Sequence, residues 1–132
     1  MTTIQPRPAG QPRPVGSRRL VSAGTITGNP VRNLSGEDLG KIEEIMLDSA
    51  SGRIAYAVLS FGGFLGMGDK LFAVPWAALS LNDDRDGFIL NVDQGVMEEA
   101  PGFDKDEWPD FADPTWGRSI HAHYNATPYW DR

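Results

Sequence analysis

Few residues of this chain have the types and spacing that catalysis or metal binding needs. The only two histidines, His121 and His123, are two positions apart, and on an extended segment both would point to the same side. Two imidazoles at this spacing can hold a transition metal, and Asp113 or Asp131 can add an oxygen ligand. The alternative is that the two histidines only pack and form ordinary hydrogen bonds beside Tyr124, and we expect this rather than a bound metal.

Carboxylates form two clusters in the sequence. A pair of carboxylates can act as acid and base when the surroundings separate their pKa values. Both clusters lie in polar, turn-rich sequence, where we expect every carboxylate to stay ionised. The chain has no cysteine, and no nucleophile–base pair or cofactor motif accompanies the acids, so we expect neither enzyme activity nor a cofactor. The clusters are Glu43, Glu44 and Asp48, and Asp83, Asp84 and Asp86.

Length and charge limit the class of protein. The 132 residues fit one domain. A net charge of −6 argues against a nucleic-acid binder, which needs clustered lysines and arginines. No apolar run approaches the roughly 18 residues that span a bilayer, and the N-terminus lacks the apolar core of a secretory signal. We therefore expect a small acidic cytoplasmic protein.

Residues 1–21 form a basic arm that differs from the rest of the chain. The stretch 1–19 has four arginines, four prolines and no acid. Its few apolar residues cannot offset the entropy of ordering, so we predict a disordered arm. The arginines can contact anionic lipid at roughly 1 kcal/mol per charge. A weak peripheral membrane contact through 1–19 is therefore a second hypothesis for the function.

Residues 22–93 carry most of the β-strand signal. The run 54–61 is short, β-branched and aromatic, and it has apolar side chains on both faces. Such a strand needs a core on one side and a second cover on the other. Ser51-Gly52 before it is typical of a hairpin turn, and we predict an antiparallel sandwich or barrel. Further predicted elements are strands at 71–74 and 88–92 and a helical turn at 76–79.

The segment 37–47 is ambiguous from its own pattern. Its apolar residues recur at helical spacing, after a sequence at 35–38 that resembles a capping box. Gly40 and the hairpin turn that follows favour a strand instead. Both interpretations stay open on the pattern alone.

Residues 94–132 combine dense acids with many aromatic side chains. Residues 94–100 fit one or two helical turns, and four later prolines predict a mostly irregular extension. A disordered acidic tail would not carry so many rings, each of which can bury about 150–250 Å². We therefore expect these rings to cover the strand at 54–61, either in this chain or in a neighbouring subunit. They are Phe103, Trp108, Phe111, Trp116, Tyr124, Tyr129 and Trp130.

Several segments match one known family in order. They are Gly28–Val31, Gly36–Ile42, Tyr56–Gly66, Lys70–Trp76, Ala100–Lys105, Trp108–Asp110 and Pro128–Trp130. Through them the chain resembles the PRC-barrel family, above all its stand-alone bacterial members. The family is named for the photosynthetic reaction centre H subunit, and its barrel also forms the C-terminal part of a ribosome-maturation factor. The resemblance covers roughly residues 22–130.

The resemblance implies a small β-barrel of short antiparallel strands, and it makes 39–48 a strand. It implies a protein-interaction module without catalytic activity. We therefore predict a non-catalytic assembly module that self-associates as a homodimer or higher oligomer and binds a further, unknown protein. A membrane-peripheral scaffold related to the H subunit and a small ligand-binding barrel are the alternatives.

Two segments are candidates for the contact surface. The loop 61–68 has four glycines and several large apolar residues, which either dock on a partner or fill the end of the barrel. It lacks the Gly-Lys-Ser/Thr ending of a phosphate loop. The aromatic extension is the second candidate. The predicted interaction residues are Phe61, Phe64, Leu65, Met67, Trp108, Trp116, Tyr129 and Trp130.

Overall fold

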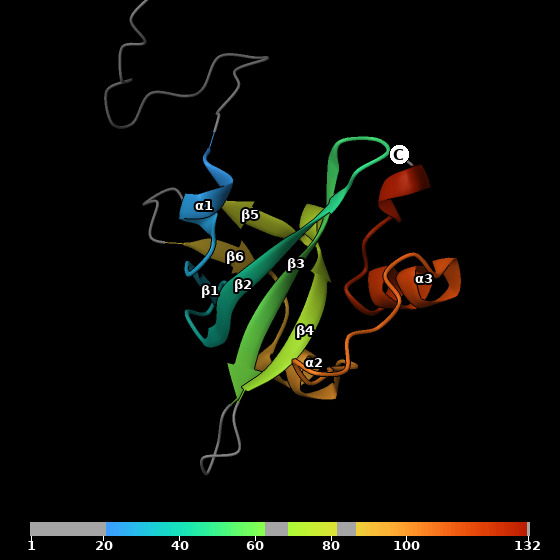
Figure 1. Cartoon of the computed structure of the whole chain (residues 1–132). Coiled ribbons are helices and arrows are strands. Elements are labelled where there is room, and N and C mark those ends of the chain that lie inside the picture. Colours follow the sequence, from blue (N-terminus) through green and yellow to red (C-terminus); the bar gives the residue numbers. More distant parts are fainter. Residues whose placement is uncertain (1–20, 63–68, 82–86, 132) are drawn as a thin grey trace, which may run out of the picture.

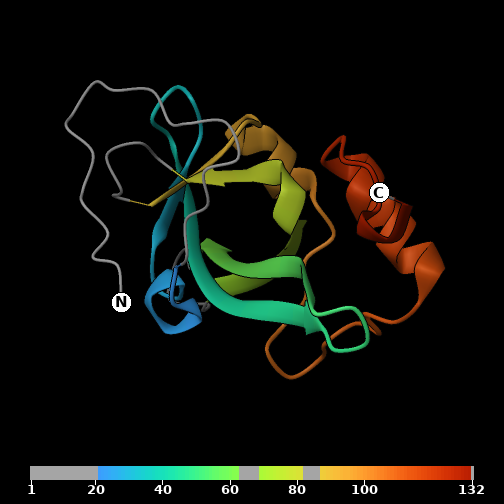
Figure 2. The same cartoon turned by 90° about the horizontal axis from the view of Figure 1, so that it is seen from above.

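The computed structural model describes residues 21–62, 69–81 and 87–131, and its main feature is a curled sheet of six strands (Figures 1 and 2). The order across the sheet is β4-β3-β2-β1-β6-β5. This half-barrel confirms the predicted fold class. The strands are β1 (Pro30–Arg32), β2 (Asp38–Asp48), β3 (Arg53–Gly62), β4 (Asp69–Pro75), β5 (Leu79–Leu81) and β6 (Phe88–Leu90).

One strand pair departs from the antiparallel pattern that the family resemblance implied. β1 and β6 are parallel, with Val31 opposite Phe88. The chain reaches the last two strands through a corner between β4 and β5. Pro75 cannot donate a ladder hydrogen bond, so β4 ends there and the 3-10 turn η2 (Trp76–Ala78) leads to β5. β5 lies at the other end of the sheet from β4 and pairs antiparallel with β6, which in turn pairs parallel with β1.

The ambiguous segment 37–47 forms strand β2, and the helical interpretation was wrong. Its helix-like spacing comes from a register shift between Ile42 and Glu44, where a bulge adds a residue. Ile42 faces Leu59 and Ile45 faces Ala57, so two apolar residues three positions apart share one face of the sheet. Tertiary pairing with β3 therefore explains a pattern that otherwise suggests a helix.

Helices α1 (Ala23–Ile26) and α2 (Gln94–Glu99) are short, whereas α3 (Pro114–His123) was not expected. The prediction of a mostly irregular extension was wrong at α3. Pro114 occupies the first turn, where its missing N–H costs nothing, and Asp113 Oδ1 accepts a hydrogen bond from Thr115 N at 2.9 Å. Asn125, with a left-handed φ of 54°, ends the helix. The proline expected to interrupt the segment therefore begins a helix.

Strand β3 is buried on both faces, as its sequence predicts. Ala57 and Leu59 pair with Val74 and Phe72 of β4, and all four face the interior of the curled sheet. On the outer face, Tyr56 is 1% exposed and Val58 is fully buried. That outer face is covered by residues Phe103–Asp131 of the same chain, which we call the C-terminal segment. Its helix α3 lies outside the curl in both views (Figures 1 and 2).

Some predicted features fall outside the described residues. They include the arm at 1–20 and, from the loop 61–68, Phe64, Leu65 and Met67. In the part of the chain that is described, no helix has the length and apolar character needed to cross a membrane.

Candidate functional site

The ring of Tyr56 is the centre of the contact between the sheet and the C-terminal segment. Four rings of the segment surround it, with centroids 5.3 to 6.1 Å away. Such edge-on and tilted pairs add about 0.5–1.5 kcal/mol each beyond the area they bury. Burial also raises the pKa of the Tyr56 hydroxyl to about 12, with a smaller contribution from Tyr129. The surrounding rings are Phe111, Trp116, His121 and Tyr129.

A second contact holds the start of the C-terminal segment on the outer edge of β4. Leu71 and Phe103 exchange two backbone hydrogen bonds of 2.9 and 2.8 Å, as a pair in an antiparallel ladder does. Beside this bridge, Lys70 Nζ lies 3.3 Å from Asp104 Oδ1 in an exposed ion pair. Trp108, 40% exposed, packs its ring 5.1 Å from that of Phe103. The segment therefore covers part of the outer edge of β4, whose backbone groups would otherwise be free to pair with another strand.

The third contact lies where the β2–β3 hairpin meets the C-terminal turn η3 (Tyr129–Asp131). The Tyr129 hydroxyl donates a hydrogen bond to Asp48 Oδ2 at 3.0 Å, and Arg53 Nη1 donates to the Tyr129 carbonyl at 2.7 Å. The hydrogen bond from Tyr129 is the main cause that lowers the pKa of Asp48. Burial first, and then Asp48, raises the pKa of Tyr129.

Two large apolar side chains stay exposed beside this contact. Leu47, next to Asp48, is 60% exposed, and Trp130, next to Tyr129, is 36% exposed. Because their neighbours are hydrogen-bonded to each other, both lie at the same end of the molecule. We call this surface the hairpin end and define it by Leu47, Asp48, Arg53, Tyr129 and Trp130.

The two histidines do not converge on a common point. The geometry that would aim both imidazoles to one side requires an extended segment, whereas both histidines lie on α3, where residues two apart point to different sides. His121 is buried, with Nδ1 2.7 Å from the Gly117 carbonyl, and His123 Nε2 lies 3.0 Å from the Val96 carbonyl. Among the described residues, no group of three or more potential ligands is placed to hold a metal ion.

The carboxylates of the first sequence cluster are not brought together for acid–base chemistry. Glu43 and Glu44 are exposed on β2, and Asp48 is bound to Tyr129. The second cluster, Asp83 to Asp86, lies outside the described residues. Of the first cluster, Asp48 is the member that takes part in the attachment at the hairpin end.

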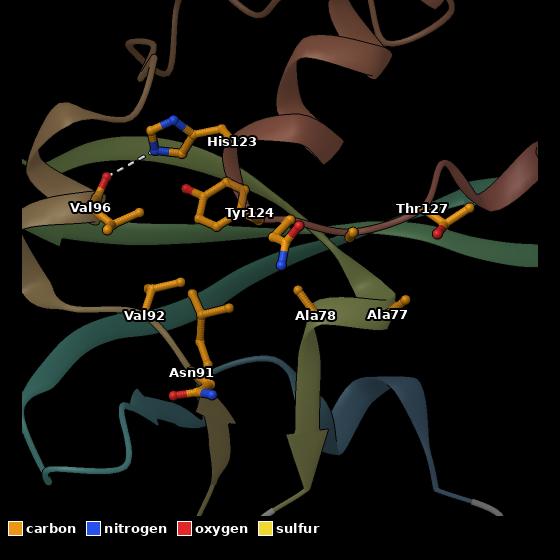
Figure 3. Close-up of a pocket in the computed structure, with 11 residues that line it drawn as sticks. Ala77, Ala78, Asn91, Val92, Val96, His123, Tyr124 and Thr127 are labelled. Carbon is orange, nitrogen blue, oxygen red and sulfur yellow. Dashed lines mark hydrogen bonds between the residues drawn. The ribbon is translucent and has the colours of Figure 1, made fainter.

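A shallow cleft of about 450 Å³ lies between the η2 corner, the end of β6 and the C-terminal end of α3 (Figure 3). Small apolar side chains such as Ala78 and Val92 line it, together with the amides of Asn91 and Asn125. Among the described residues that line it, the titratable side chains are His123 and Tyr124, and burial raises the pKa of the Tyr124 hydroxyl.

The predicted interaction residues that the structure describes are mostly turned toward their own chain. Phe61 is partly buried, with its ring 6.4 Å from that of Phe72, and Trp116 packs 4.7 Å from Phe111. Tyr129 is partly buried and tied to the hairpin, which leaves Trp108 and Trp130 as the exposed members of the set. Leu47 was not predicted as an exposed residue from the sequence, because an apolar residue in a strand is expected to face the core.

The succession of short strands, the η2 corner and the closed hairpin agrees with the comparison with known families. A family model described as PRC-barrel domain matches residues 19–97. The chain belongs to the PRC-barrel family. The match covers all six strands and ends in α2, so the C-terminal segment lies beyond the part of this PRC-barrel protein that the family defines. A comparison with curated proteins finds no match.

Proposed function

We propose that this PRC-barrel protein is a non-catalytic assembly module that self-associates through the hairpin end. The observation that carries the proposal is that two apolar side chains, Leu47 and Trp130, are exposed next to the residues that form the Asp48–Tyr129 hydrogen bond. Single exposed apolar residues are ordinary on a protein surface, and the proposal depends on both side chains being buried by one partner.

The chemistry of the hairpin end suits contact with a second copy. Tryptophan and arginine are the residues most enriched where binding energy concentrates, and the surface has Trp130 with Arg118 stacked over its ring at 5.9 Å. Arg53 and Asp48 provide opposite charges at the same place, so two copies related by a twofold axis can pair these charges reciprocally. A closed dimer would remove Leu47 and Trp130 from water.

The test is the size of the full chain in solution, measured by light scattering over a range of concentrations. Leu47→Glu places a charge in the proposed contact and should weaken self-association by about tenfold or more, which corresponds to about 1.4 kcal/mol. Leu34→Glu is the matched control, because Leu34 is 72% exposed in a turn away from the hairpin. A wild-type chain that is monomeric at every concentration, or two variants that behave alike, would contradict the proposal.

A further inference from the structure

We propose that the basic arm binds the exposed ring of Trp108 on the body of its own chain. An arginine of the arm stacks on this ring, and the carboxylates around Trp108 are its ion-pair partners. The inference goes beyond the proposed self-association and does not depend on it, because the surface around Trp108 is not part of the hairpin end.

Trp108 is a large apolar side chain that the fold holds in place but does not cover. It is 40% exposed, and its ring packs beside Phe103 and Phe111, with centroids 5.1 and 5.9 Å away. Its Nε1 donates a hydrogen bond to the Lys105 carbonyl at 2.8 Å, so the polar atom of the ring already has a partner. The exposed part of the side chain is therefore ring carbon, and the face of an indole attracts cations.

The charges next to Trp108 in the sequence are mostly negative. Residues 104–110 have four carboxylates and one lysine, and the side chains of Asp106 and Glu107 are exposed. Within the part of the chain that the structure describes, the ion pair of this stretch is the one between Lys70 and Asp104. The surface therefore offers a guanidinium both an aromatic ring and carboxylates that have no cationic partner there.

The other exposed tryptophan already has the kind of contact that we propose for Trp108. Arg118 lies over the Trp130 ring, with its Cζ 5.9 Å from the ring centroid. Among residues 21–62, 69–81 and 87–131, no cation lies over the Trp108 ring in this way. The hairpin end also has Arg53, which makes it less favourable for a basic segment. Of the two exposed tryptophans, Trp108 is therefore the one whose surroundings suit a further arginine.

The arm has the complementary composition. Residues 1–19 have four arginines and no acid, and all 18 acidic residues of the chain follow them. The units Arg7-Pro8 and Arg13-Pro14 each place a proline beside an arginine. Proline-rich segments dock on exposed aromatic side chains, so the prolines suit the same surface as the arginines.

The arm is long enough to reach Trp108 on its own chain. The described residues begin at Val21, and the chain before it can span up to about 70 Å when extended. A domain of this size has a radius of gyration of about 13 Å, so its whole surface lies within that reach. Tethering also gives the arm a local concentration in the millimolar range, which favours its own chain over a second copy.

A nitroxide label on the arm of the full chain tests this contact by NMR. The natural chain has no cysteine, so Gly10→Cys provides a single labelling site between the two Arg-Pro units. At an ionic strength of about 0.01 M, where the Debye length is about 30 Å, the Trp108 indole signal should lose most of its intensity. The Trp130 indole signal should keep its intensity, and about 1 M salt should restore that of Trp108. Equal loss at both tryptophans, or loss at neither, would overturn the proposal.

Two pairs of substitutions separate a specific contact from general attraction to an acidic protein. Asp106→Lys with Glu107→Lys should abolish the loss of the Trp108 signal. Glu43→Lys with Glu44→Lys makes the same change of charge on exposed side chains of β2 and should leave the loss intact. If both pairs act alike, the arm is attracted to the net charge alone and the proposed contact is wrong.

Two further measurements test the ring and the choice of chain. Trp108→Leu keeps the carboxylates but removes the aromatic face, so the backbone signals of residues 104–110 should then keep their intensity; continued loss would overturn the role of the ring. The second measurement mixes isotope-labelled chains that have no nitroxide with unlabelled chains that have it. The Trp108 signal should keep its intensity in this mixture. Loss there would place the arm on a second copy and overturn binding within one chain.

Discussion

The hydroxyl of Tyr129 donates a hydrogen bond to Asp48 Oδ2 at 3.0 Å, across 81 positions of sequence. This bond fixes the last turn of the chain to the tip of the β2–β3 hairpin, and Arg53 strengthens the same contact by binding the Tyr129 carbonyl. Asp48 gains a partner that favours its ionised form, and its pKa is lowered mainly for that reason. The attachment of the C-terminal segment is therefore linked to pH.

The first prediction concerns Tyr129→Phe, which keeps the ring but removes the hydroxyl. We expect a lower melting temperature at neutral pH and an Asp48 pKa that returns toward its ordinary value of 3.8. A carboxylate with a lowered folded-state pKa contributes stability above its unfolded-state pKa and loses it as the pH falls through the folded-state value. The gap in stability between the wild type and the variant should therefore begin to narrow near pH 3.8 and close as the pH falls through the lowered folded-state pKa of Asp48.

The control for this prediction is a double-mutant cycle with Asp48→Asn, read by thermal unfolding from neutral pH to below the pKa of Asp48. In the Asp48→Asn background, Tyr129→Phe should no longer have a pH-dependent effect. A pH-dependent loss that persists in that background would assign the effect to another group.

The second prediction concerns the close approach of α3 to the sheet at Gly117. A Cβ at this position would lie 2.8 Å from Trp130 Cη2 and 2.9 Å from the Tyr56 hydroxyl oxygen. Gly117→Ala should therefore displace the helix or the Trp130 ring, and lower the free energy of unfolding by about 1–3 kcal/mol. Urea unfolding measures the change, and tryptophan fluorescence should report the displacement of Trp130.

Gly95 in α2 provides the matched control for Gly117. A Cβ on Gly95 meets no atom within 4 Å, and its backbone has ordinary helical geometry. Gly95→Ala should raise the free energy of unfolding by up to about 1 kcal/mol, because alanine favours the helix. Equal losses from both substitutions would show that Gly117 is not held by close packing.

The third prediction compares the aspartates that precede α2 and α3. Asp113 accepts a hydrogen bond from Thr115 N, whereas the Asp93 side chain makes no such cap hydrogen bond. Asp113→Ala should lower the free energy of unfolding by about 1 kcal/mol. Asp93→Ala should have a smaller effect in the same urea titration. A larger loss from Asp93→Ala would contradict the assignment of Asp113 as the cap.

The sheet was predictable because its strands obey local rules. The run around Tyr56 has apolar residues on both faces, and the structure buries both. The segment 37–47 was not predictable from periodicity, because a bulge next to Ile42 gives a strand the spacing of a helix. There the family resemblance supplied the correct answer. The turn at Pro75 was predictable, but the parallel pairing of β1 with β6 joins residues as far apart in the sequence as Val31 and Phe88, which no local pattern reveals.

The candidate site was predictable in part. The aromatic residues of the extension correctly indicated that it covers the strand at 54–61. The number of prolines, however, led to a prediction of irregular structure where a helix carries Trp116 and His121. Pro114 is compatible with a first helical turn, and Asp113 before it is a cap signal that was available in the sequence. The hairpin end could not be found from the sequence, because it depends on a contact between Asp48 and Tyr129 across the whole fold.

The last prediction concerns the Tyr56 hydroxyl, which is buried and has no hydrogen-bond partner among the described residues. An unsatisfied buried hydroxyl costs free energy, so Tyr56→Phe should leave the free energy of unfolding unchanged or raise it by up to about 1 kcal/mol. Tyr124→Phe is the control, because the Tyr124 hydroxyl donates to Met97 Sδ at 3.6 Å and its loss should be destabilising.

The pH dependence of Tyr56→Phe sharpens this test. Burial raises the pKa of Tyr56 from 10.0 to about 12. A group with a raised folded-state pKa gives its full stabilisation below the unfolded-state value and loses it as the pH rises through the folded-state value. The wild type should therefore lose stability between pH 10 and about 12 that Tyr56→Phe retains. A Tyr56→Phe chain that is less stable than the wild type throughout this range would show that the hydroxyl binds a partner in the folded protein.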